Sequence, residues 1–257
     1  MQFDFSGKNV LVTGGNKGLG LGVAEAYIAA AATVTIVGLE PEVAETADRL
    51  TDKHWQKVRG ITCDIADLDA VQDMAAQAGP TDILINNAGL ELITPIDDPD
   101  PGVDATFRRI TEINVIGTFS VTRALLPKIA DGGRVINTAS MWGKTAVAEF
   151  SAYCASKHAV IGLTRSLAQE LAPRRISVNA VCPGWVRTEA SMRSLTAMSD
   201  RTGRPEDDLL AEITGAQAFD GLMEPNDMAA MYLFLGSDAA ANITGQSFTV
   251  DRGELMQ

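Results

Sequence analysis

Aromatic side chains are scarce in this sequence, at 5% of 257 residues, although 46% of the residues are hydrophobic. An aromatic-rich β-sandwich is therefore a poor match, whereas abundant alanine and glycine suit helices that pack closely on a sheet. No repeat, linker or low-complexity tract divides the chain. A chain of this length can bury one full core, so we expect one α/β domain that covers residues 1–257.

Positive charge is also in deficit, because 21 lysine and arginine residues stand against 33 aspartate and glutamate residues, a formal net charge of −12. Such a chain has no cationic excess to release counterions from nucleic acid, and it repels an anionic membrane surface. The longest apolar stretch, residues 23–39, is interrupted by Glu25 and fits a helix followed by a strand better than a membrane span. We therefore expect a small-molecule ligand, with neither nucleic acid nor a membrane as partner.

Cysteine and histidine are rare as well. Cys63, Cys154 and Cys182 are odd in number and have no CxxC spacing, which predicts buried, reduced thiols. His54 and His158 lie far apart without a second ligand at metal spacing, so we expect no metal. The first ten residues lack the basic and apolar regions of a secretory signal, which makes a cytoplasmic location the default expectation.

Short β-branched runs alternate with amphipathic or alanine-rich stretches along the whole chain. Runs such as ILIN and VLV are apolar on both faces, as parallel strands covered by helices on both sides must be. The pattern predicts a doubly wound, seven-stranded parallel sheet with helices on both faces. The expected strands are 9–13, 33–37, 58–63, 82–86, 134–138, 176–181 and 247–250, and the expected helices are 18–31, 41–52, 67–77, 104–130, 151–171 and 225–236.

Two segments interrupt this alternation. Residues 91–103 contain three prolines and three aspartates, which predicts a solvated loop after the fourth strand. Residues 189–220 contain no strand, read as helical in parts, and follow directly on the carboxyl end of a strand. Open α/β sheets bind ligands at that end, so we interpret residues 189–220 as a movable substrate lid.

The first strand runs into TGGNKGLG at residues 13–20 and then into an alanine-rich helix. Gly14, Gly18 and Gly20 let the turn close and let the backbone approach a pyrophosphate at the helix N-terminus, where N–H groups and the helix dipole favour negative charge. A glycine-rich turn alone also occurs in ordinary strand-to-helix connections. Its position between the first strand and a helix favours a dinucleotide.

Tyr153 and Lys157 lie four residues apart on an expected helix and therefore on one face. A free phenol ionises near pH ~10 and becomes a useful base only beside positive charge, which Lys157 would supply. Ser140 lies just after the fifth strand, where its hydroxyl can polarise a substrate oxygen. A YxxxK pair alone is also compatible with an exposed aromatic–cation pair. Together with Ser140 and the glycine turn, it favours proton transfer.

The glycine spacing, TGxxxGxG, resembles the short-chain dehydrogenase/reductase family, and five further motifs follow in the order of that family. The resemblance extends to TGQSFTVD at 244–251 and so covers essentially the whole chain. It implies a Rossmann fold and an enzyme that moves a hydride between a nicotinamide cofactor and a carbonyl or alcohol carbon. The five motifs are CD at 63–64, NNAG at 86–89, NVIG at 114–117, Ser140 with YCASK at 153–157, and PGWVRT at 183–188.

The same resemblance assigns roles to individual residues. Asn114 joins Ser140, Tyr153 and Lys157 as a catalytic residue, because in the family such a residue helps to hold a water that relays protons from the lysine. Asp64 and Ile65 would contact adenine, and Asn87 would support the central strand near the ribose. Thr188 and Val186 would hold the nicotinamide amide. The full set expected to bind the cofactor is Gly14, Asn16, Lys17, Gly18, Leu19, Gly20, Gly38, Leu39, Asp64, Ile65, Asn87, Ala88, Gly89, Tyr153, Lys157, Pro183, Gly184, Val186 and Thr188.

The second strand ends without the acid that would bind adenosine ribose hydroxyls, because Gly38 stands at that position. Lys17 favours the extra phosphate of NADP. Glu40 favours NAD, and Leu39 stands where many users of NADP carry arginine. On balance we expect NAD.

The segments CPGWVRT and SDAAANITGQ and the length of the lid resemble the bacterial 3-hydroxybutyrate dehydrogenase branch, whose pocket grips a small carboxylate with glutamine, histidine and lysine. This sequence has Glu91, Trp142 and Phe150 at those positions. Together with Trp185, they indicate a bulkier neutral or cationic substrate, partly apolar or polyhydroxylated, with Glu91 hydrogen-bonding a hydroxyl or an amine.

The sequence leaves the role of Arg252 and the exact function open. Arg252 stands where relatives commonly have glycine, in VDRG, and would serve a salt bridge or a subunit interface. The resemblance implies a homotetramer. Two alternatives to an NAD-dependent dehydrogenase remain: an NADPH-dependent 3-oxoacyl carrier-protein reductase, favoured by Lys17 but opposed by the acidic surface, and a catalytically silent dinucleotide sensor, which would not need the complete catalytic set.

Overall fold

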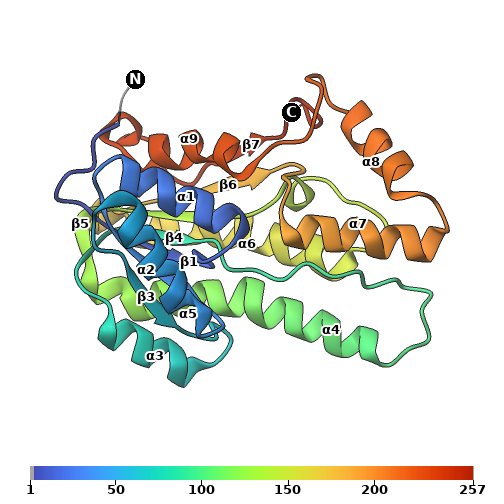
Figure 1. The fold of residues 1–257 in the computed structure, drawn as a ribbon. Coiled ribbons are helices and arrows are strands. Elements are labelled where there is room, and N and C mark those ends of the chain that lie inside the picture. The colour runs from blue at the N-terminus through green and yellow to red at the C-terminus, as the bar shows by residue number, and fades with distance from the viewer. Residues whose placement is uncertain (1–2, 257) are drawn as a thin grey trace.

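The computed structural model describes residues 3–256, and its seven parallel strands form one sheet in the order β3-β2-β1-β4-β5-β6-β7 (Figure 1). The predicted doubly wound α/β fold is thus confirmed. The strands are β1 Asn9–Thr13, β2 Thr33–Gly38, β3 Arg59–Thr62, β4 Thr81–Asn86, β5 Ile129–Thr138, β6 Ser177–Pro183 and β7 Ser247–Val250. The α-helices are α1 Gly18–Ala29, α2 Glu42–His54, α3 Leu68–Gln77, α4 Gly102–Thr111, α5 Thr118–Leu125, α6 Ser151–Leu171, α7 Glu189–Thr202, α8 Glu206–Gly215 and α9 Pro225–Gly236.

Alternation along each strand sends successive side chains into two separate cores. In β1, Val10 and Val12 pack in the core formed with α1, α2 and α9, whereas Leu11 packs in the core formed with α3, α5 and α6. Figure 1 shows α1 and α9 on one side of the sheet and α3 and α5 on the other. Apolar residues on both strand faces therefore follow from coverage on both sides.

The strand order reverses direction between β1 and β4. From β1 the chain adds β2 and then β3 on one side, and it then returns to add β4 through β7 on the other. Connections that leave β1 and β4 in opposite directions open a crevice at the carboxyl ends of these two strands.

The helix predicted over 104–130 is wrong as a continuous element. The chain instead forms α4, a π-helical turn over Glu112–Gly117, α5 and a short 3-10 turn. The π-helical turn buries Asn114, and a Cβ added to Gly117 would lie 2.9 Å from the carbonyl oxygen of Ile65. Close packing of this segment on the sheet edge explains the local change of helical pitch.

The fifth strand begins at Ile129 rather than at the predicted residue 134. Ile129 pairs with Thr81, and the pairing then shifts before it resumes between Ile83 and Arg134. The shift contains Gly132, which has a φ of +77°. The glycine pair in IADGGR suggests a turn in the sequence, but in the structure it marks a bulge inside the strand.

The segment expected to be a lid, residues 189–220, contains α7 and α8, which project beyond the sheet in Figure 1. Arg252 lies at the base of this segment with a φ of +56°. Its carbonyl oxygen accepts hydrogen bonds from the amides of Ala218 and Phe219, and its guanidinium lies 3.6 Å from the Asp227 carboxylate. Arg252 therefore forms an ion pair within the chain.

The three cysteines are buried free thiols, as predicted. Within residues 3–256, none of the helices combines the length and apolar character needed to cross a membrane.

Candidate active site

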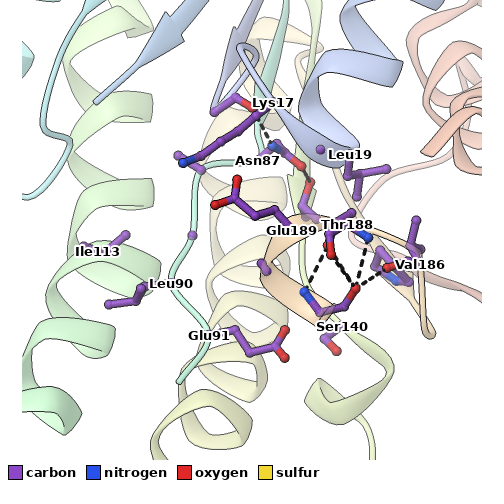
Figure 2. Close-up of a pocket in the computed structure, with 18 of the residues that line it drawn as sticks. Lys17, Leu19, Asn87, Leu90, Glu91, Ile113, Ser140, Val186, Thr188 and Glu189 are labelled. Carbon is purple, nitrogen blue, oxygen red and sulfur yellow. Dashed lines mark hydrogen bonds between the residues drawn. The ribbon is translucent and has the colours of Figure 1, made fainter. Parts of the chain in front are cut away.

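A cavity of about 470 Å³ lies at the carboxyl ends of β1, β4, β5 and β6. The loops that follow these strands and the first turn of α7 form its walls, as Figure 2 shows for the residues it labels. The cavity therefore occupies the crevice that the strand order creates.

The glycine turn after β1 forms one wall. Gly14 has a φ of +63°, and a Cβ added there would lie 3.0 Å from the Cα of Ala88. A Cβ added to Gly20 would lie 2.1 Å from the carbonyl oxygen of Gly14, so only glycine fits there. Helix α1 begins at Gly18 without a side-chain cap or an acidic residue in its first turn. Its uncapped N–H groups suit the phosphates of a dinucleotide.

Asn87 joins the ends of β1 and β4 behind this turn. Its side-chain amide donates to the carbonyl oxygens of Thr13, at 3.2 Å, and Gly14, at 3.3 Å. The Thr13 hydroxyl in turn accepts from the amides of Asn87 and Ala88. Asn87 thus fixes the glycine turn to the adjacent strand.

The side chain of Asn16 occupies the space beside Gly38 at the end of β2. A Cβ added to Gly38 would lie only 2.7 Å from the Asn16 Oδ1 atom. Further along this wall, the Asp64 Oδ2 atom lies 2.7 Å from the Arg109 Nη2 atom. Lys17 and Glu40 also line this part of the cavity. This wall therefore carries positive and negative side chains, and the Arg109 guanidinium is already paired with Asp64.

The cavity lining includes every residue predicted to bind the cofactor except Gly20, which packs behind Gly14. Thr188 is the N-cap of α7, and its hydroxyl accepts from the amide of Ser191. The remaining predicted residues in the lining are Leu19, Leu39, Ile65, Ala88, Gly89, Pro183, Gly184 and Val186.

Ser140, Tyr153 and Lys157 come together at the inner end of the cavity. Ser140 follows β5, and its hydroxyl accepts from the amide of Trp142 at 3.2 Å. Tyr153 and Lys157 share one face of α6, with the Lys157 Nζ atom 5.5 Å from the centre of the Tyr153 ring. The Lys157 ammonium donates to the carbonyl oxygen of Thr138 at 2.8 Å, which fixes its position behind the phenol.

Burial shifts the pKa values of the two titratable groups in this set. It raises the pKa of Tyr153 well above its usual value, and Glu91 raises it further, while a hydrogen bond with Ser140 acts in the opposite direction. Burial lowers the pKa of Lys157 to about 8, against the opposing effect of Glu91. The phenol therefore needs positive charge beside it before it can give up a proton near neutral pH.

Asn114 lies outside the cavity lining, in the π-helical turn. Its side-chain oxygen accepts from the amide of Leu90 at 2.7 Å, and its amide donates to the Leu90 carbonyl oxygen and to the Ser156 hydroxyl, each at 2.9 Å. A Cβ added to Gly89 would lie 3.2 Å from Asn114 Oδ1 and 3.5 Å from Lys157 Nζ. Asn114 and Lys157 therefore approach Gly89 together.

Three of the four predicted substrate residues, Glu91, Trp142 and Trp185, line the cavity. The two tryptophan rings meet edge to face, with centres 5.8 Å apart. Phe150 is fully buried outside the lining, and its ring centre lies 5.1 Å from that of Trp142. Phe150 therefore supports the Trp142 wall instead of forming part of the surface of the cavity.

Sequence reasoning did not select three charged residues that line the cavity, Arg109, Glu189 and Arg193. Arg109 lies on α4, and Glu189 and Arg193 lie on α7. None belongs to a motif. The lid assignment identified the segment that carries Glu189 and Arg193 but not the helix face that meets the cavity.

The comparisons with known proteins agree with this geometry. The family model for short chain dehydrogenases matches residues 8–199. The D-beta-hydroxybutyrate dehydrogenase of Cupriavidus necator is 34% identical, with 98% of this chain and 99% of that protein covered. The D-threitol dehydrogenase of Mycolicibacterium smegmatis is also 34% identical, with coverage of 98% and 95%.

A solved structure adds a three-dimensional comparison. The L-sorbose reductase of Gluconobacter frateurii, complexed with NADPH and L-sorbose, superposes with a TM-score of 0.90 at 25% identity, with full coverage of both chains. The family match spans well over half of the chain, and the glycine turn, the Ser140–Tyr153–Lys157 set and the cavity all lie in the matched region. The chain therefore belongs to the short chain dehydrogenase family of NAD(P)-dependent oxidoreductases that act on alcohol and carbonyl groups.

Proposed function

We propose that this enzyme is an NAD-dependent dehydrogenase of bulky neutral or polyhydroxylated secondary alcohols, and that it also catalyses the reverse reduction. The substrate end of the cavity carries this proposal, because two aromatic walls and the Glu91 carboxyl stand in place of a cationic grip for a small carboxylate. The names of two relatives, a D-threitol dehydrogenase and an L-sorbose reductase, support a polyhydroxylated substrate.

The catalytic side chains supply the proton chemistry. When bound in this cavity, NAD(P) would supply the hydride acceptor or donor and, in its oxidised form, a positive charge. During oxidation Tyr153 removes the hydroxyl proton, and Ser140 donates a hydrogen bond to the developing alkoxide. The Lys157 ammonium, 5.5 Å from the centre of the Tyr153 ring, favours the ionised phenol. Asn114 keeps the loop at Leu90 in place and would help to hold a water next to Lys157.

Tyr153→Phe tests this assignment. We expect kcat to fall by at least about 100-fold, because the proton acceptor is removed. The affinity for NADH, measured by fluorescence titration, should stay within about threefold of wild type. Retained turnover would place the proton acceptor elsewhere. A wild-type protein that binds NADH but oxidises no alcohol and reduces no ketone would favour the sensor alternative.

The preference for NAD is a separate proposal. Arg109 is paired with Asp64, so Lys17 is the cation expected to bind the 2′-phosphate of NADP. The nearby Glu40 carboxylate would repel that phosphate. We expect NADH to bind at least about tenfold more tightly than NADPH, and Glu40→Gln to reduce that ratio. Tighter binding of NADPH, together with turnover of a carrier-linked 3-oxoacyl substrate, would favour the reductase alternative.

The substrate class is tested with a panel of neutral aromatic alcohols, polyols and 3-hydroxybutyrate. We expect the neutral alcohols to have the higher kcat/KM, because Glu91 repels a carboxylate. A preference for 3-hydroxybutyrate that is lost in Arg193→Ala would assign Arg193 as a carboxylate anchor instead.

By family resemblance we also propose a homotetramer in the cytoplasm, with light scattering on the purified protein as the test of assembly.

A further inference from the structure

Glu91 is the carboxylate at the catalytic end of the cavity. It lies in the loop between β4 and α4, two residues after Gly89. Figure 2 shows its carboxyl group pointing across the cavity toward Ser140. A substrate oxygen bound by Ser140 and Tyr153 would therefore have Glu91 on its far side.

Helix α7 holds Glu91 at two points. Ser194, which is 3% exposed, forms a hydrogen bond with the Glu91 carboxyl group. The neighbouring Arg193 guanidinium donates to the Glu91 backbone carbonyl oxygen at 3.3 Å. Successive residues of the lid helix thus fix both the side chain and the backbone, which limits the positions that the carboxyl group can adopt.

Glu91 interacts electrostatically with the reacting groups. Burial raises its pKa, and the Ser194 hydrogen bond, Lys157 and Arg193 act against this effect. Glu91 in turn raises the pKa values of Tyr153 and Lys157. A carboxylate here accepts hydrogen bonds and repels anions, so it selects a neutral substrate group that carries a donor.

We propose that Glu91, positioned by Ser194, determines specificity by accepting a hydrogen bond from a second hydroxyl on the carbon next to the reacting one. The preferred substrates are then vicinal diols, and in the reverse direction α-hydroxy ketones. This inference rests on the proposed alcohol dehydrogenase function.

The reaction balances without any further reactant. The C–H bond of one carbinol carbon breaks, and its hydride passes to oxidised nicotinamide. The proton of that hydroxyl passes to Tyr153, and the carbonyl group forms. The second hydroxyl keeps its proton and only shares it with Glu91. The products are an α-hydroxy ketone, reduced nicotinamide and a proton released to solvent.

Alcohols that differ by one hydroxyl test the proposal. We would measure kcat and KM for butane-2,3-diol against butan-2-ol and for cyclohexane-1,2-diol against cyclohexanol. In the wild type we expect kcat/KM for the diol to exceed that for the monoalcohol by about 10- to 100-fold, because the monoalcohol offers no donor to the substrate-facing side of the Glu91 carboxyl group. The difference should lie mainly in KM.

Variants separate recognition from folding. Glu91→Leu should bring the diol-to-monoalcohol ratio close to one, and Glu91→Gln should keep part of it because an amide oxygen still accepts. Ser194→Ala should reduce the ratio, and Ser194→Thr, which retains the hydroxyl, should restore it. Thr196→Ala is the matched control, because Thr196 lies on the same helix and bonds to Met192 and Glu206 instead.

Each outcome bears on a different claim. A wild-type ratio near one, or an unchanged ratio in Glu91→Leu, would overturn the role of Glu91. An unchanged ratio in Ser194→Ala would overturn the positioning role of Ser194 alone. If the wild type binds NADH yet oxidises neither diols nor monoalcohols with either nucleotide, the proposed function itself fails.

Discussion

At the scale of single residues, Glu91 sets a negative charge beside a phenol that must lose a proton. Burial is the main cause of the raised pKa of Tyr153, and Glu91 adds to it. Glu91 also opposes the fall in the pKa of Lys157 to about 8. Removal of this one charge therefore lowers both pKa values.

Glu91→Gln should move the pH dependence of alcohol oxidation to lower pH. Tyr153 ionises more easily without the neighbouring carboxylate, so the acidic limb of kcat/KM shifts down, and the limb that follows loss of the Lys157 proton shifts in the same direction. The measurement is a pH–rate profile with a monoalcohol. Glu206→Gln, a charge change on α8, serves as control. An acidic limb that stays in place or moves up would contradict the assigned interaction.

Residue types and spacing, together with the family resemblance that the motifs carry, were enough to predict most of the cavity lining. The exceptions have local physical causes. Phe150 directly follows Glu149, whose φ is +68°, and this backbone turn directs the Phe150 ring into the core behind Trp142. A left-handed backbone conformation is normally predicted at glycine or asparagine, so the sequence gives no sign of it at Glu149. The position of Phe150 therefore could not be predicted.

At the scale of elements, Arg201 ties helix α7 to two other segments. Its guanidinium contacts the carboxylates of Asp97, at 2.5 Å, Asp98, at 3.9 Å, and Glu149. The two aspartates belong to the loop after β4, and Glu149 directly precedes Phe150, which begins α6 as its N-cap. Several charges around one arginine hold a helix better than an isolated surface pair does.

Arg201→Ala should loosen α7 over the substrate end of the cavity. We expect KM for alcohols to rise by about two- to tenfold, while the Kd for NADH changes little, because Arg201 holds the helix at the substrate end and lies away from the glycine turn. Arg204→Ala is the control, since Arg204 pairs with Glu212 instead, across the α7–α8 connection. Concentrated KCl should raise KM in the wild type and have less effect in Arg201→Ala. Equal effects of the two substitutions would contradict the tie.

Helix existence could be predicted from periodicity, but changes of pitch could not. Residues 104–130 carry a continuous helical pattern, yet the chain widens into a π-helical turn that buries Asn114 and packs Gly117 against Ile65. These contacts are made with segments far away in the sequence. Periodicity describes one element by itself, so it does not contain them.

At the scale of the whole molecule, two hydrogen bonds of buried hydroxyl groups connect α1, α9 and β5. The Tyr27 hydroxyl donates to the carbonyl oxygen of Tyr232 at 2.7 Å, and the Tyr232 hydroxyl lies 2.8 Å from that of Thr138. Both tyrosines are fully buried. Tyr27 also lies close against Gly236, so this connection fixes α1 on α9.

Tyr27→Phe should lower the free energy of unfolding by about 1–2 kcal/mol, because the buried Tyr232 carbonyl loses its partner while the ring volume is kept. Urea denaturation of the purified protein measures this change. NADH affinity should stay normal, since Tyr27 lies outside the cavity lining. A variant as stable as wild type would mean that another donor satisfies the carbonyl oxygen.

Strand order was not visible in the hydrophobic pattern alone. The pattern predicted seven strands in a doubly wound sheet, but it did not predict that the order reverses between β1 and β4. The pairing partners lie far apart in sequence, as Val10 and Ile83 do. Local patterns cannot encode which distant strand is the neighbour.

The strand order has a consequence for how the chain is made. Strand β6 is buried along its whole length, and β7 covers its outer edge through the pairs from Ala180–Ser247 to Pro183–Val250. Strand β7 is the last of the seven strands to leave the ribosome. The outer edge of β6 therefore stays unpaired and apolar until synthesis is nearly complete. Chains that stop before residue 247 should therefore aggregate instead of persisting as weakened enzymes.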